Sequence, residues 1–187
     1  MFSPELVVLT DEAGHAIGAA QKAEVHTTQT PLHLAFSCHV LDAEGRVLVT
    51  RRALAKKTWP GVWTNSFCGH PAPGEDTEDA ITRRAARELG IRLTDLRPAL
   101  PDYRYRAVDA SGIVENEICP VYVARIDGDL SPADDEVAEW AWVSPQQLAE
   151  AVTAAPFAFS PWLVEQLPQL VALGALTTRP ALNGAPA

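Results

Sequence analysis

Two pairs of reactive side chains stand out in this chain because they share one spacing. Cys68 and His70 are separated by a single residue, and so are Glu115 and Glu117 further along. In an extended strand, residues two positions apart project from the same face of the sheet. Each pair can therefore aim both of its functional groups into one cavity. A thiol, imidazoles and carboxylates that meet in this way are typical of a metal-assisted active site.

Further histidines extend this set into a possible metal site. Three neutral imidazoles and two carboxylates suit a six-coordinate Mn²⁺ or Mg²⁺, and imidazole ligands favour a transition metal. The five residues are His26, His33, His70, Glu115 and Glu117. Their spacing is not that of a zinc finger, and on spacing alone the two glutamates are better explained as exposed strand residues.

The other thiols and imidazoles are expected to be structural. Cys38 and Cys119 lie within apolar strand patterns, where a cysteine is usually inert packing. His15 and His39 are interpreted as surface or structural histidines. Cys68 differs, because a neighbouring imidazole or metal can change how readily its thiolate forms, so that it can act as an acid or base.

Basic and aromatic residues supply candidate substrate contacts. A basic cluster precedes the segment 59–63, and it is either a solvated face or a clamp for an anion; it consists of Arg51, Arg52, Lys56 and Lys57. Arg84 and Glu88 are one helical turn apart. They form either a simple ion pair or a place for a diphosphate and its bridging Mg²⁺. Tyr105 and Trp162 are either core residues or aromatic faces that stabilise a carbocation.

Composition limits the class of protein. The chain has 187 residues, 47% of them hydrophobic and 21% charged, which is typical of a single globular domain. Its net charge of −9 disfavours nucleic acid and anionic membranes as partners. Three cysteines without framework spacing indicate a reducing compartment, and the N-terminus lacks the pattern of a signal peptide. We therefore expect a cytoplasmic protein.

The order of predicted elements indicates one mixed α/β domain. Strands are predicted over residues 5–10, 32–41, 46–50, 62–67, 100–107, 113–125 and 137–143. Helices are predicted over 76–88, 144–152 and 161–173, the first with an acidic start and Gly90 as its cap. His33 and His39 share a predicted strand with even spacing, so parity does not distinguish them. The tail from residue 174 is expected to be mobile.

Residues 69–91 resemble a Nudix box. The family pattern is Gly-x5-Glu-x7-Arg-Glu-U-x-Glu-Glu-x-Gly-U, in which U is apolar, and it is matched by Gly69, Glu75, Arg83, Glu88, Gly90 and Ile91. Arg84 and Arg87 replace two glutamates. Because Nudix hydrolases use these glutamates to bind the Mg²⁺ that activates water, the arginines argue against a pyrophosphohydrolase and leave diphosphate binding open.

A wider resemblance, from about residue 6 to residue 162, is to the type 1 isopentenyl-diphosphate Δ-isomerases. The stretches that carry it are 32–36, 51–53, 59–66, 68–71, 103–106 and 112–117. The resemblance implies an α/β (α+β) fold of the Nudix type, with a mixed sheet sandwiched by helices in one compact domain. It divides the chain into an N-terminal extension that contributes to the site (1–30), a catalytic domain (31–165) and a helix end with a flexible tail (166–187).

The same resemblance implies two metal ions and a diphosphate site. Mn²⁺, or Mg²⁺ or Zn²⁺ in its place, would be bound by His26, His33, His70, Glu115 and Glu117. A Mg²⁺ on the substrate diphosphate would be bound by Glu88 and the backbone oxygen of Cys68. The diphosphate itself would be bound by Lys22, Arg52, Lys56 and Arg84.

The implied reaction is the reversible conversion of isopentenyl diphosphate to dimethylallyl diphosphate in isoprenoid biosynthesis. Glu117 would add a proton to the terminal alkene carbon, and Cys68 would remove one from C2 on the opposite face. Tyr105 would assist Glu117, and Trp162 would face the cation. The partner is then a small allylic or homoallylic diphosphate, bound by a monomer or weak homodimer. A Nudix pyrophosphohydrolase and a catalytically dead binding module are the alternatives.

Overall fold

Two β-sheets form the framework of the protein, whose computed structural model describes residues 5–177. The smaller sheet has the order β2-β1-β3-β10-β9, with bounds Ala16–Gln21, Leu6–Thr10, His33–Leu34, Val114–Ile118 and Arg104–Val108. The larger has the order β12-β5-β4-β11-β8, with bounds Val137–Val143, Val47–Arg52, Phe36–Leu41, Val121–Asp127 and Arg92–Leu100. Two short strands join it, β6 (Trp63–Thr64) on β5 and β7 (Phe67–Gly69) on β4.

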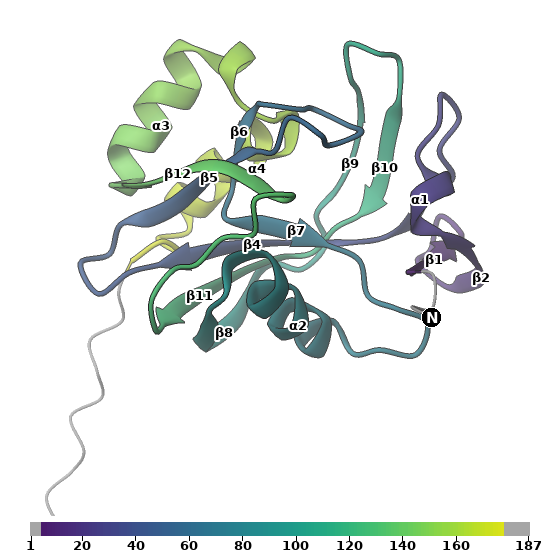
Figure 1. Ribbon diagram of the computed structural model, residues 1–187, viewed down its shortest axis with the longest axis horizontal. Helices are drawn as coiled ribbons and strands as arrows, with labels where there is room; N and C mark the ends of the chain where they lie inside the picture. Colours follow the sequence, from purple (N-terminus) through teal and green to yellow (C-terminus); the bar gives the residue numbers. More distant parts are fainter. Residues whose placement is uncertain (1–4, 178–187) are drawn as a thin grey trace, which may run out of the picture.

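Helices cover both faces of the larger sheet (Figure 1). On one face α2 (Thr77–Leu89) packs its buried Ile81, Ala85 and Leu89 against Phe36 of β4. On the other face lie α3 (Pro145–Ala154) and α4 (Pro161–Ala172), which pack against inward residues of β5 and β11. The expected fold class, a mixed sheet sandwiched by helices, is confirmed. A fourth helix, α1 (Lys22–Val25), is a single turn beside the smaller sheet.

The predicted helix over residues 76–88 is confirmed with its caps. The Asp76 side chain accepts a hydrogen bond from the amide of Glu78, and Gly90 ends the helix in the left-handed conformation at φ 68°. Gly69 lets this helix approach β7, because a Cβ there would lie 2.7 Å from the ring of Phe36 and 2.9 Å from Arg84 Cγ. The two glycines of the motif thus fix where the helix ends and how closely it packs.

The predictions of single strands over 32–41 and 113–125 are wrong. Each segment starts in the smaller sheet and crosses into the larger one, at Ala35 and at Cys119–Pro120. β3 pairs with β10 and β4 with β11, both in parallel, so the chain makes the same crossing twice side by side. As a result His33 and His39 belong to different sheets, and their even spacing does not place them on a shared strand face.

Other predicted boundaries are partly confirmed. Ser144 and Ser160 cap α3 and α4 through their hydroxyl groups, each followed by a proline at the start of the helix. β2, α1 and most of β8 were not predicted, because their residues show no clear periodicity.

The expected segment boundaries at 30 and 165 fall within continuous structure. β1 pairs with β3 across the first boundary, and α4 continues past the second. The predicted tail extends to residues 178–187, which lie outside the described part. Within residues 5–177 no helix is long and apolar enough to cross a bilayer.

Candidate active site

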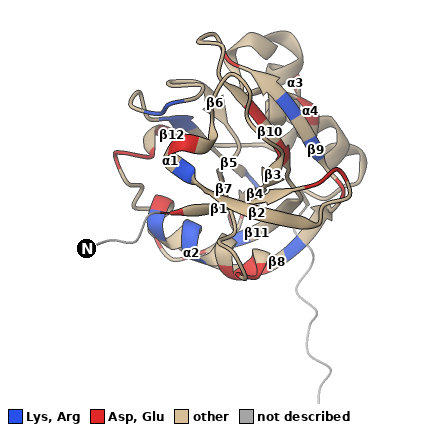
Figure 2. Ribbon diagram, turned by 90° about the vertical axis from the view of Figure 1, so that its right-hand side faces the viewer, with Lys and Arg blue, Asp and Glu red and all other residues tan. Residues whose placement is uncertain are grey.

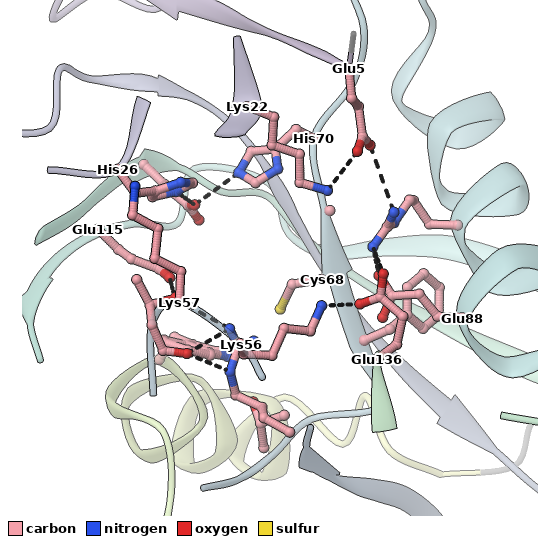
Figure 3. A pocket seen from close by; sticks show the side chains of 18 of the residues that line it. Glu5, Lys22, His26, Lys56, Lys57, Cys68, His70, Glu88, Glu115 and Glu136 are labelled. Atoms are coloured by element: carbon pink, nitrogen blue, oxygen red, sulfur yellow. Dashed lines mark hydrogen bonds and ion pairs between the residues drawn. The ribbon is translucent and has the colours of Figure 1, made fainter. Parts of the chain in front are cut away.

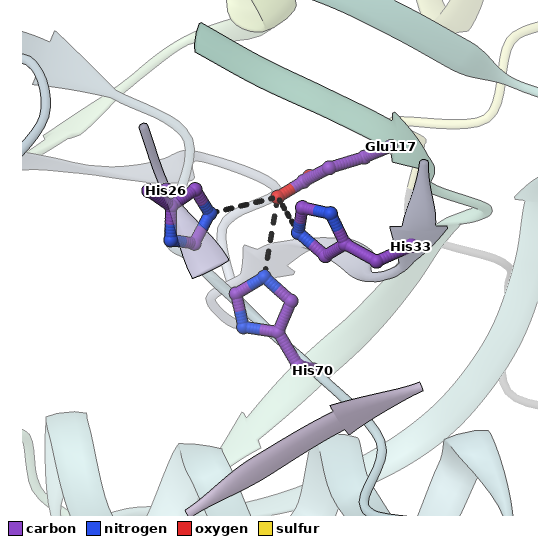
Figure 4. Close-up of side chains that lie close together, drawn as sticks. All are labelled: His26, His33, His70 and Glu117. Carbon is purple, nitrogen blue, oxygen red and sulfur yellow. Dashed lines mark hydrogen bonds and ion pairs between the residues drawn. The ribbon is translucent and has the colours of Figure 1, made fainter. Parts of the chain in front are cut away.

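Four of the five predicted metal ligands converge on one point (Figure 4). His26 follows α1, His33 lies in β3, His70 follows β7, and Glu117 lies in β10 directly beside His33 in the parallel register. One oxygen of the Glu117 carboxylate lies 3.9, 3.4 and 3.2 Å from the Nε2 atoms of His26, His33 and His70. The ligand atoms of all four residues lie within 4.8 Å of one another. The fold thus brings together side chains up to 91 residues apart in the sequence.

The chemistry of these four residues fits a divalent metal ion. The Nδ1 of His33 lies 2.9 Å from the carbonyl oxygen of Pro31, which favours the tautomer whose free Nε2 lone pair faces the cluster. The Nε2 atoms of His26 and His33 are buried and have no hydrogen-bond partner among the described residues. An unpartnered buried nitrogen is costly, and a metal ion would provide the partner.

Electrostatics within the cluster support the same conclusion. Burial opposes the charge on Glu117, but the three imidazoles outweigh it and hold the carboxyl pKa well below its usual range. Burial lowers the pKa of His70 to about 4, so its imidazole is neutral at pH 7. An ionised carboxylate and a neutral imidazole are the forms that bind metal ions.

Glu115, the fifth predicted ligand, lies outside this four-residue cluster. Its carboxylate accepts hydrogen bonds from the hydroxyl groups of Thr58 at 2.5 Å and Tyr105 at 2.6 Å. Tyr105 was expected to assist Glu117, but its hydroxyl contacts Glu115 instead. The two glutamates share a face of β10, as their spacing predicted, yet they have different partners.

Cys68 and the aromatic residues line the same cavity as the cluster. Burial raises the pKa of the Cys68 thiol to about 12, so the resting group is the thiol. The ring of Trp162 lies 5.6 Å from that of Tyr105, and the guanidinium of Arg52 lies 5.6 Å from the indole centroid. The indole of Trp162 therefore already stabilises one positive charge, that of the Arg52 guanidinium.

The four predicted diphosphate ligands also line this cavity, which has a volume of about 410 Å³ (Figure 3). They come from α1, β5, the loop after it and α2, and they are Lys22, Arg52, Lys56 and Arg84. Three of them are paired with carboxylates: Lys22 with Glu5 at 3.0 Å, Lys56 with Glu136, and Arg84 with Glu88. Lys22, Arg84 and Lys56 are linked to one another through Glu5 and Glu136, and we call this part of the cavity its diphosphate end.

This end of the cavity combines charges of both signs. The whole cavity is lined by five basic residues (Lys22, Arg52, Lys56, Lys57 and Arg84) and five acidic ones (Glu5, Glu88, Glu115, Glu117 and Glu136). Figure 2 shows the same alternation of blue and red on α1 and α2. The buried Nε of Arg84 has no partner among the described residues. It is therefore a donor available to an anion.

Several residues of the site were missed by sequence reasoning. Glu136 contacts both Lys56 and Arg84, and it was not among the predicted site residues. Asn65 was noted only as part of a motif, and it accepts hydrogen bonds from both Cys68 and Trp162. Arg51 belongs to the predicted basic cluster but points elsewhere and pairs with Glu139. The alternation of a strand separates it from Arg52.

Comparisons with known proteins identify the family of the chain. The NUDIX domain family model matches residues 31–163. The isopentenyl-diphosphate Delta-isomerase of Paenarthrobacter aurescens is 61% identical over 176 residues, covering 94% of this chain and 96% of the relative. That of Agromyces mediolanus is 64% identical over 172 residues, covering 92% and 84%.

Solved structures show the same fold at lower identity. The protein DR0079 from Deinococcus radiodurans superposes with a TM-score of 0.69 at 19% identity, covering 88% of this chain and 98% of that one. A MutT NUDIX hydrolase from Burkholderia pseudomallei gives a TM-score of 0.59 at 22% identity, covering 74% and 98%. These two likenesses concern the fold alone. The extensive identity to the curated relatives shows that the chain belongs to the isopentenyl-diphosphate Delta-isomerase family within the NUDIX domain proteins.

Proposed function

We propose that this enzyme interconverts isopentenyl diphosphate and dimethylallyl diphosphate by moving a double bond within the substrate. The observation that carries the proposal is a single cavity with two chemically different ends. One end holds a partly buried thiol near a carboxylate that three imidazoles surround, and the other holds the cationic side chains of Lys22, Lys56 and Arg84. A short hydrocarbon chain with a diphosphate at one end matches both.

Cys68 and Glu117 are the two proton carriers of the proposal. The reaction adds one proton to the terminal alkene carbon and removes one from C2, so it needs two groups that exchange protons with carbon. Both residues line the cavity, where Glu117 is buried and Cys68 is partly buried. Trp162, which is 1% exposed, presents a ring that can stabilise the tertiary cation between the two transfers.

The bound metal in this proposal is Mn²⁺, with Mg²⁺ or Zn²⁺ as alternatives, held by His26, His33, His70 and Glu117. Such an ion polarises the carboxylate that exchanges a proton with substrate. Glu115 donates no ligand atom to the four-residue cluster; through Thr58 and Tyr105 it fixes the neighbouring wall. Whichever metal binds, the protein residues orient the carboxylate and exclude water.

Diphosphate binding is assigned to Lys22, Arg52, Lys56 and Arg84, with a second Mg²⁺ at Glu88 and the backbone oxygen of Cys68. Desolvation lowers the pKa of Lys56 to about 8, and desolvation also lowers that of Lys22. An incoming diphosphate would favour their charged forms and compete with Glu5 and Glu136 for them. Glu88 would then be free to hold a Mg²⁺, which would supply positive charge to the diphosphate.

The test follows product and phosphate together. Wild-type protein with Mn²⁺ and isopentenyl diphosphate should form dimethylallyl diphosphate, detected by proton NMR, without releasing phosphate. Cys68→Ala and Glu117→Gln should each lose most turnover, whereas Cys119→Ala, at a buried thiol outside the cavity lining, should keep it. Near-wild-type turnover in either of the first two variants would overturn the two-carrier mechanism. Phosphate release without isomerisation would favour the hydrolase instead.

A further inference from the structure

Asn65 lies between Cys68 and Trp162, two residues that face the substrate in the proposed function. Its side chain is fully buried. Its amide nitrogen donates to the backbone oxygens of Cys38 at 3.0 Å and Phe67 at 2.8 Å. Both hydrogens of the amide are thereby used, which fixes the orientation of the group and points Oδ1 the other way.

The fixed oxygen faces the reactive groups. It accepts hydrogen bonds from the thiol of Cys68 at 3.3 Å and from the indole Nε1 of Trp162 at 2.9 Å. The Thr64 hydroxyl lies 2.9 Å away as a third donor, but it has an alternative partner in Ser160 at 2.8 Å. The indole nitrogen is only a donor. One amide oxygen therefore sets the position of sulfur relative to ring.

The sulfur of Cys68 makes a second hydrogen bond, in which either atom can be the donor and the sulfur can therefore be the acceptor. Ser37 is the register partner of Cys68 across β4 and β7, and its oxygen lies 3.3 Å from Sγ. The Gln166 side-chain nitrogen donates to that oxygen at 3.0 Å, so the serine's own hydrogen is available to a sulfur. The other sulfur within reach is Cys119, at 3.5 Å.

We propose that Asn65 and Ser37 are positioning residues for the isomerisation, which hold the Cys68 sulfur in place relative to the indole of Trp162. This rests on the proposed function. In each turnover one of Cys68 and Glu117 gives its proton to the terminal carbon, the other takes the proton that leaves C2, and proton exchange with solvent returns both groups to their starting forms. The sulfur is therefore a thiol on one side of its proton transfer and a thiolate on the other. As a thiol it donates to Asn65; as a thiolate, having kept the electron pair of the S–H bond, it accepts from Ser37.

A matched pair of variants tests the role of Asn65. Asn65→Leu keeps the approximate shape without an acceptor, and Asn65→Asp retains an acceptor oxygen. In Asn65→Leu we expect kcat to fall about 100-fold, as for a misplaced reactive group, with KM within about threefold because the diphosphate contacts are elsewhere. The S–H stretching band of Cys68, assigned by difference from Cys68→Ala, should shift to higher frequency. Asn65→Asp keeps an oxygen for the Cys68 thiol but loses the two amide hydrogens that orient it, so it should restore part of the band position and less of kcat.

Ser37→Ala provides an independent test that does not depend on the Asn65 variants folding. Loss of one hydrogen bond to a charged sulfur should lower kcat about tenfold with unchanged KM. Cys119→Ala, which removes the other sulfur near Ser37, is the control and should behave as wild type. Wild-type kcat in folded Asn65→Leu or Ser37→Ala, or a loss of kcat in Asn65→Leu with an unmoved S–H band, would overturn the proposal. If the wild type does not isomerise the substrate but the S–H band still shifts in Asn65→Leu, only the proposed function is refuted.

Discussion

The two ends of the cavity are built in different ways. At the metal end, His33 and Glu117 lie on strands that pair directly, and the imidazoles point at one carboxylate oxygen. At the diphosphate end, Arg52 lies at the end of β5, but the other cationic side chains come from a one-turn helix, a loop and the face of α2, and these three are held by acidic partners.

The metal end is therefore preformed, whereas the cations of the diphosphate end can exchange their carboxylate partners for the substrate. Paired strands fix ligand atoms to within a few tenths of an ångström without requiring a substrate. Ion pairs between Lys or Arg and Glu keep the cations in place, but they can be replaced by stronger, charge-assisted contacts to a diphosphate. We expect changes at the first end to affect the chemical step and changes at the second to affect substrate binding.

The largest effect is expected from His33→Gln, with His39→Gln as its matched control. Both histidines are fully buried, but only His33 belongs to the metal cluster. We expect His33→Gln to lose bound Mn²⁺, measured by elemental analysis, and to lower kcat about a thousandfold, since the carboxylate that exchanges protons loses its support. His39→Gln should retain the metal. Equal metal content in the two variants would contradict the proposed cluster.

At the other end, two adjacent arginines of α2 offer the sharpest contrast. Arg84 lines the cavity, whereas Arg83 lies outside it and pairs with Glu75 at 2.7 Å. Arg84→Gln should raise KM about 100-fold, because it removes a cation and leaves Glu88 uncompensated against the substrate. Arg83→Gln should leave KM within about twofold. A loss in kcat with unchanged KM for Arg84→Gln would place this arginine in the chemical step.

Removal of the metal should lower the free energy of unfolding only in proteins whose metal end is intact. A ligand at 100 to 1,000 times its Kd stabilises the folded state by roughly 3–4 kcal/mol. Chelation of wild-type protein should therefore lower Tm by several degrees in a thermal-unfolding scan. Arg84→Gln should show the same decrease, and His33→Gln none. A decrease in His33→Gln as large as in wild type would locate the stabilising metal elsewhere.

The smallest effect concerns His39, which belongs to neither end. Burial lowers its pKa to about 4, while its imidazole contacts Gln166 at 3.0 Å. As pH falls below 6.5 the unfolded chain binds a proton before the folded one does, so stability decreases with falling pH. From pH 7.5 to 5.5 the loss is on the order of 1 kcal/mol. Denaturant unfolding of His39→Gln should show a shallower pH dependence than wild type over this range; an identical dependence would contradict the assignment.

Much of the site could be predicted from short-range patterns. The spacing of Cys68 with His70 and of Glu115 with Glu117 survives in the structure because strand geometry is local. The Gly90 cap of α2 was predicted for the same reason, since it acts within one turn of the helix. The resemblance in sequence supplied the reaction and the candidate ligands.

What failed depended on contacts between distant segments. Ala35 and Pro120 do not show in the sequence that the chain changes sheets there, because the crossing is stabilised by parallel partners about 80 residues away. The partner of the Tyr105 hydroxyl could not be assigned either, since Glu115 and Glu117 share one strand face.

The sequence by itself determined the residue types, the α2 motif and the family of this enzyme, because these depend on local order along the chain. Only the tertiary structure decided that Glu115 lies outside the four-residue cluster, that Glu136 balances Lys56 and Arg84, and that one oxygen of Asn65 connects the thiol to the indole. The physical reason is that hydrogen bonds and ion pairs form only over a few ångströms, and the packing of segments distant in the sequence brings those atoms within that distance.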